Sequence, residues 1–206
     1  MPLQNRVLPT GEILAISARG TLTGNRGIIH RDDKTLGTSR WSHHAWICCT
    51  LDWQGRKRPV MTGRNWTELF FLDEAAAFAA GHRPCGYCRR AAYRDFVAAW
   101  TTATGERPSA KDMDKALHPA RVRRDRKQVR YEAQLQSLPD GAMILVKGAP
   151  ALYWDGALYP YTADRYAAPI AANRKTTVTV LTPKPTVKVL QAGYKPQIHP
   201  SISANR

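Results

Sequence analysis

Residues 80–88 read Ala-Gly-His-Arg-Pro-Cys-Gly-Tyr-Cys, and this stretch decides how the chain is organised. Gly81 and Pro84 are typical of residues that follow the end of a helix. We therefore predict one helix over 74–80, capped by Asp73. The C-x-x-C pair then opens a second helix that runs to about residue 104, where another glycine follows. The sequence therefore predicts two short helices joined at a pair of cysteines.

Cys85 and Cys88 have the spacing of metal ligands. A C-x-x-C pair at a helix start places two sulfur atoms about one turn apart, and the free N–H groups there stabilise thiolates. Zinc takes four ligands, so this pair supplies half of a tetrahedral site. In a reducing compartment such cysteines bind metal or stay free rather than form disulfides.

The remaining ligands must come from residues upstream of the pair. Cys48 and Cys49 are adjacent in a predicted strand and point to opposite faces, so only one of them can reach the metal. We predict Cys49, because its face is the more core-like, and His30 as the fourth ligand, because it follows a glycine-rich loop. His43 or His44 is the alternative to His30.

Residues 68–88, ELFFLDEAAAFAAGHRPCGYC, are similar to the end of the zinc-binding domain of the Ada DNA-repair family. The resemblance extends over roughly 66–92 and implies zinc ligation by Cys85 and Cys88, and DNA binding. The family also has an upstream C-x-x-x-C pair that carries a methyl acceptor. This chain has only the adjacent Cys48 and Cys49, so the methyl acceptor does not carry over.

The fold class predicted for the whole chain is α+β. An Ada-like zinc-binding module over 1–105, built from a β-hairpin and two helices, precedes a small β-rich module of unknown role over 120–206. A basic linker region, 106–130, joins them. The hairpin of the first module is predicted from apolar runs at 44–53 and 58–61.

Further elements follow from turn and capping residues. The three glycines of 20–27 predict a tight loop after a strand at 12–17. Ser109 and Asp112 have capping-box spacing for a third helix that Pro119 ends. The C-terminal half has an Asp-Gly hairpin turn at 155–156, strands predicted at 128–135, 142–147, 151–154 and 176–181, and a short helix at 186–191.

The chain of 206 residues carries 31 Lys and Arg against 16 Asp and Glu, a formal net charge of +15. Nucleic acid is the leading partner for such a surplus, because cations on phosphates release counterions. No run reaches the roughly 20 apolar residues of a membrane helix, and the first residues lack the apolar core of a signal peptide. We therefore expect a cytoplasmic protein without membrane contact.

Two basic clusters are the predicted nucleic-acid contacts. The denser one lies in 121–130 and the other at the tip of the predicted hairpin. Guanidinium groups suit phosphate oxygens because of their fork geometry. The candidate residues are Arg121, Arg123, Arg124, Arg126, Lys127 and Arg130, together with Arg56, Lys57 and Arg58.

These features predict a zinc-containing DNA-binding protein acting in repair, modification or defence. The alternative is an enzyme acting on DNA: a nuclease, a base-removing glycosylase or an alkyl-accepting repair protein, with Cys49 as the acceptor in the last case. His30 with Asp32 and Asp33 could hold a cation or activate water, but their spacing matches no catalytic motif, so no catalytic residue is assigned. A third interpretation is an interaction module for an acidic protein.

Overall fold

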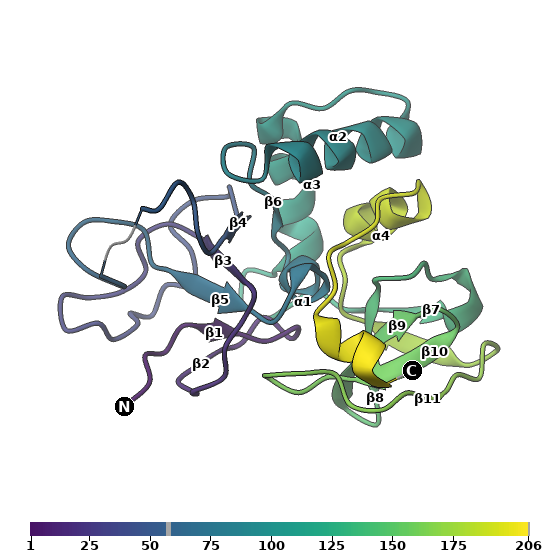
Figure 1. Ribbon diagram of the computed structural model, residues 1–206. Helices are drawn as coiled ribbons and strands as arrows, with labels where there is room; N and C mark the ends of the chain where they lie inside the picture. The colour runs from purple at the N-terminus through teal and green to yellow at the C-terminus, as the bar shows by residue number, and fades with distance from the viewer. Residues whose placement is uncertain (57–58, 206) are drawn as a thin grey trace.

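The computed structural model describes residues 1–56 and 59–205, and these residues form four α-helices and two six-stranded sheets. Figure 1 shows one sheet on each side of the short helix α1 (Glu74–Ala79), with α2 (Arg90–Thr104) at the top above α3 (Ala110–Arg121) and α4 (Lys184–Gln191). The predicted mixture of helices and strands is thus confirmed. No helix within the described residues is long and apolar enough to cross a membrane.

The N-terminal sheet has the strand order β2-β1-β5-β3-β4-β6. Strand β3 pairs antiparallel with β4 and β5, whereas β4 and β6 are parallel. The parallel pair matters for the site, because it brings segments about 35 residues apart side by side. The strands are β1 (Arg6–Val7), β2 (Ile13–Leu14), β3 (Leu22–Asn25), β4 (Ile47–Thr50), β5 (Leu69–Phe71) and β6 (Arg83–Pro84).

Two predictions for this half are wrong. The predicted loop at 20–27 contains β3, and its glycines serve close packing: a Cβ on Gly24 would lie 2.2 Å from the carbonyl oxygen of Ile47 in the neighbouring strand. The predicted hairpin from 44–53 to 58–61 is also absent, because β4 pairs with β3 and β6 instead. Lys57 and Arg58, at its predicted tip, lie outside the described residues.

The helices follow their caps closely. In α1 (Glu74–Ala79) the carboxylate of Asp73 accepts a hydrogen bond from the N–H of Ala76 at 2.9 Å, as predicted. Helix α2 (Arg90–Thr104) begins later than predicted, because the residues from Cys85 onward form a turn first.

Helix α3 (Ala110–Arg121) has the predicted capping box between Ser109 and Asp112. Pro119 does not end this helix, which continues for two more residues. The extra residues bring Arg121 to the end of α3, where its guanidinium donates to the carbonyls of Gly81 and His44. These tertiary contacts favour helix past the proline.

The C-terminal sheet has the strand order β11-β10-β9-β8-β12-β7, with every neighbouring pair antiparallel. The predicted Asp155-Gly156 turn joins β9 to β10, with Trp154 opposite Ala157. The elements of this half are β7 (Tyr131–Gln134), η1 (Leu135–Ser137), β8 (Met143–Val146), β9 (Ala149–Trp154), β10 (Ala157–Pro160), β11 (Ile170–Ala171), β12 (Thr177–Val180), α4 (Lys184–Gln191) and η2 (Pro200–Asn205).

Helix α1 joins the two halves, because all six of its residues are buried. Ala77 and Phe78 pack into the core of the N-terminal sheet and α2, whereas Ala75 and Ala79 pack with Met143 of the second sheet and its neighbours. A helix buried on every side acts as a shared core element. The division into modules at 1–105 and 120–206 stays a prediction, and its two parts share this helix.

Candidate functional site

Three cysteines meet beside the parallel strand pair. Register places Cys48 of β4 opposite Pro84 of β6, and the N–H of Cys85 donates to the carbonyl of Cys48 at 2.9 Å. The next residue along β4 is Cys49, and the turn after Cys85 returns Cys88 to the same place. One sulfur from each of Cys49, Cys85 and Cys88 lies within 4.8 Å of the other two.

The environment favours thiolate at one of these three sulfurs, that of Cys85. The N–H of Tyr87 donates to the Sγ of Cys85 at 3.4 Å. Hydrogen bonds from Cys49 and Cys88, together with backbone N–H groups of the turn, hold the pKa of the Cys85 thiol far below its usual value. Hydrogen bonds to Cys85 and Cys88, together with burial, raise the pKa of the Cys49 thiol, and the pKa of the Cys88 thiol is raised as well. A cluster of three sulfurs at this distance can hold a metal ion, because a deprotonated thiol is the ligand that soft and borderline metals prefer.

Cys48 is excluded from the cluster by the alternation of the strand. It is fully buried in the core of the N-terminal half, and burial raises its pKa to about 12. The Nη1 of Arg89 donates to its sulfur at 3.2 Å. Strand geometry thus separates Cys48 from Cys49 as predicted, but the assigned faces are reversed: Cys48 has the core-like face and Cys49 faces the cluster.

The histidines proposed as fourth ligands do not join the three sulfurs. The Nδ1 of His30 lies 2.7 Å from the hydroxyl of Thr67, and its strand-like bridge is to Leu36. His44 stacks on His118 with ring centroids 3.7 Å apart, and His43 is exposed. Among the residues that the structure describes, only Cys49, Cys85 and Cys88 form the group.

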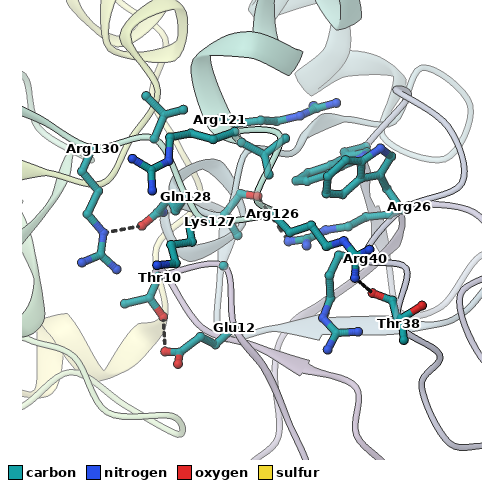
Figure 2. A pocket seen from close by; sticks show the side chains of 17 residues that line it. Thr10, Glu12, Arg26, Thr38, Arg40, Arg121, Arg126, Lys127, Gln128 and Arg130 are labelled. Carbon is teal, nitrogen blue, oxygen red and sulfur yellow. Dashed lines mark hydrogen bonds between the residues drawn. The ribbon is translucent and has the colours of Figure 1, made fainter.

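A large basic pocket lies beside the C-terminal end of α1, where Ala80 and Trp46 line it. Its cavity volume is about 700 Å³, and seven cationic side chains line it against one carboxylate, that of Glu12. Figure 2 shows Arg130 and Lys127 on one side and Arg26, Arg40 and Arg126 on the other. We call this cavity the basic pocket; its cations are Arg26, Arg40, Arg121, Arg123, Arg126, Lys127 and Arg130.

The segment after α3 forms one wall of the basic pocket. Residues 122–128 make a tight hairpin, in which Val122 faces Gln128 and Arg126 has a positive φ of 67°. The Nη1 of Arg126 donates to the carbonyl of Thr38 at 2.6 Å, and the amide of Gln128 donates to Pro9 at 2.7 Å. These contacts fix the hairpin against the N-terminal half, so the predicted linker is an ordered wall.

The predicted nucleic-acid contacts divide into two groups. Five of the six basic residues of 121–130 line the pocket, whereas Arg124 is exposed and does not. Arg56 is exposed in the turn after β4. Arg121 differs from its expected role as a surface residue, because only 2% of it is exposed.

Arg26 is the residue that sequence reasoning missed. It follows β3, it is 2% exposed, and its guanidinium carbon lies 4.0 Å from the ring centroid of Trp46. Arg121 lies at the same distance from that ring. An arginine within an apolar and glycine-rich stretch is only a weak sign of a binding residue. Its position beside Arg121, against the same ring of Trp46, is what marks Arg26 as part of the basic pocket.

The acidic residues that follow His30 belong to a turn. Asp33 accepts hydrogen bonds from the N–H and hydroxyl of Thr35 at 2.9 and 2.7 Å, and both Asp32 and Asp33 are exposed. This arrangement is an ordinary Asx turn. A scan against protein-family models and searches of curated proteins and solved structures find no match to the chain, so the case for function rests on the cysteine cluster and the basic pocket.

The buried His82 under the pocket predicts a pH effect on stability. Its Nε2 lies 3.3 Å from the Nε of Arg26, and burial, with the charges of Arg26 and Arg121, lowers its pKa well below 6.5. The unfolded chain therefore binds a proton at His82 below pH 6.5 that the native state does not. We expect the free energy of unfolding to fall on acidification, by up to about 1.4 kcal/mol per pH unit from this group.

Urea unfolding between about pH 5 and 8 measures this effect. The matched variant is His82→Gln, which keeps an acceptor for Arg26 and cannot titrate. The difference in pH slope between the two proteins gives the contribution of His82 alone. Asp73 contributes equally to both proteins: its burial raises its pKa to about 6, so its effect on the free energy of unfolding has the opposite sign. Equal pH slopes in both proteins would contradict the prediction.

Proposed function

We propose that this chain is a zinc-containing protein that binds nucleic acid, with DNA as the first candidate, and that it acts in DNA repair, modification or defence. The observation that carries the proposal is the basic pocket, with seven cations against one carboxylate. Guanidinium and ammonium groups at this density bind phosphate oxygens and release counterions. The resemblance of residues 66–92 to the Ada zinc-binding domain supports the same class of partner.

Zinc is the metal we propose for Cys49, Cys85 and Cys88. Three sulfurs within 4.8 Å suit zinc, because structural zinc sites are built from thiolates and imidazoles. When bound, the metal would supply cross-links between β4 and the start of α2. Those cross-links would hold the β4–β6 edge. The N–H of Arg83 in β6 donates to the carbonyl of Trp46, which precedes β4 and lines the pocket.

Binding assays at several salt concentrations test the proposed partner. Labelled duplex DNA, single-stranded DNA and RNA of one sequence would each be titrated between about 50 and 200 mM salt. If the cations of the pocket and its rim contact six or more phosphates, affinity for the preferred nucleic acid should fall at least about 10³-fold over this range. A salt-independent affinity, or no binding at low salt, would contradict the proposal.

A second candidate, an enzyme acting on DNA, is favoured by the incomplete ligand set. Within the described part of the chain the cluster offers three ligands, and three protein ligands with one open position are typical of catalytic zinc sites. Incubation with plain, alkylated and base-modified DNA, followed by gels and mass spectrometry, distinguishes a nuclease, a glycosylase or an alkyl acceptor at Cys49. Unchanged DNA and unchanged Cys49 would favour the binding protein.

A further inference from the structure

The floor of the basic pocket holds two buried arginines that form no ion pair with any residue the structure describes. Arg26 and Arg121 are each 2% exposed, and their guanidinium carbons lie 4.0 Å from the ring centroid of Trp46. Charged side chains are rarely buried to this degree unless they are paired. The ring faces give partial compensation through cation–π attraction.

The hydrogen-bond partners of both guanidiniums are neutral. Arg26 donates to the ring of His82 and to the carbonyl of Ala80, both at 3.3 Å. Arg121 donates to the carbonyls of Gly81 and His44 at 2.8 and 2.6 Å. Among the described residues, neither guanidinium has a carboxylate within 4.0 Å.

Donor capacity also remains unused at the floor. The Nε of Arg121 is buried without a hydrogen-bond partner, and the Nη1 of Arg26 makes no hydrogen bond with any described residue. Asp114, the acid that acts on Arg121 from a distance, forms a two-pronged ion pair with Arg83 at 2.7 and 2.8 Å. A buried donor without an acceptor, as the Nε of Arg121 is, is costly, so the floor is suited to an incoming anion.

Charge and depth together select the kind of anion. Burial lowers the pKa of both Arg26 and Arg121 to about 9, and an anion that arrives there would reverse this shift and be held strongly. A phosphodiester carries one negative charge and has a sugar on each side, which keeps it at the rim. A phosphate monoester carries close to two charges and has one substituent, so it can enter the pocket end-on.

We propose, on the basis of the proposed function, that the floor formed by Arg26 and Arg121 binds a phosphate monoester, the terminal phosphate of a nucleic-acid strand. The exposed cations of the rim, such as Lys127 and Arg130, then contact the following diesters. Trp41 also lines the pocket, is half-buried, and offers a ring on which the terminal base can stack. A free nucleotide has the same monoester chemistry and is the other source of such a group.

The test compares one single-stranded oligonucleotide with a 5′-phosphate, with a 3′-phosphate and with hydroxyl ends, at constant ionic strength. We expect one phosphorylated form to bind at least about 10-fold tighter than the hydroxyl form. Arg121→Gln should remove this preference, so that the variant binds the phosphorylated and hydroxyl forms with equal affinity. Circular dichroism and thermal melting establish that the variant is folded.

A competition assay on the unaltered protein keeps the test independent of the variant. A nucleoside 5′-monophosphate should displace the phosphorylated oligonucleotide more effectively than the matching nucleoside or sulfate does. Equal affinity for the 5′-phosphate, 3′-phosphate and hydroxyl forms would overturn the inference. If that affinity still fell steeply with salt, the proposed nucleic-acid binding would stand without it. Loss of all oligonucleotide binding, with the monophosphate still bound, would overturn the strand end as the source of the phosphate.

Discussion

Cys49→Ser is expected to reduce the zinc content of the purified protein from about one ion per chain to nearly none. The substitution removes one of three sulfurs that lie within 4.8 Å of one another, and a serine hydroxyl is a poor zinc ligand. Stability should fall as well, because metal at 100 to 1,000 times its Kd stabilises the native state by about 2.7–4.1 kcal/mol. Metal analysis and urea unfolding, with and without a chelator, measure both effects.

The chain offers a matched control one residue away. Cys48→Ser makes the same chemical change in the same strand, but the Cys48 side chain lies in the hydrophobic core with Arg89 at 3.2 Å from its sulfur. This variant should keep its metal and lose only about 1–2 kcal/mol of stability from the altered core contact. Retention of zinc by Cys49→Ser, or its loss from Cys48→Ser alone, would contradict the assigned ligands.

The comparison of these two cysteines also indicates how far strand reasoning reaches. Alternation along β4 is local geometry, so the sequence correctly predicts that Cys48 and Cys49 point to opposite faces. Which face is buried depends on the tertiary packing of the sheet, in which Cys48 lies in one core with residues of α2, and no local pattern carries that information. The choice of Cys49 therefore placed the correct sulfur in the cluster for the wrong physical reason.

Elements with strong local signals were the most predictable. The cap at Asp73, the Ser109–Asp112 capping box and the Asp155-Gly156 hairpin all form as predicted, since each depends on a few adjacent residues. The glycines of 20–27 gave the opposite result. A glycine permits both turns and close backbone contact. Gly24 lies in a strand rather than a turn, and its missing side chain makes room for the carbonyl of Ile47.

The floor of the basic pocket shows the second limit. Arg26 and Arg121 are 95 residues apart in sequence, and α3 brings them together only by continuing past Pro119. Gly81 makes room for this contact: its φ is +86°, and a Cβ there would lie 2.5 Å from the Cδ of Arg121. The number of arginines follows from the composition, whereas the burial of Arg26 and Arg121 away from carboxylates follows only from the tertiary fold.

Reversing two charges at the rim should have the largest effect on nucleic-acid affinity. Lys127 and Arg130 are exposed, line the basic pocket, and lie outside the hydrophobic clusters. The double variant Lys127→Glu, Arg130→Glu removes two phosphate contacts and adds two repulsive charges. We expect about 100-fold weaker binding near 0.1 M salt, and a salt slope smaller by about two, since each contact contributes about 0.9.

The control separates pocket binding from the effect of net charge. Arg174→Glu with Lys175→Glu makes the same change in net charge at exposed residues before β12 that do not line the pocket. Screening beyond roughly 8–10 Å at such salt leaves only a small long-range effect for the control variant. If both variants lost affinity equally, binding would follow the surplus charge of the whole surface. A selective loss in the Lys127 and Arg130 variant would require the phosphates to lie at the mouth of the basic pocket, where its buried arginines could reach a strand end.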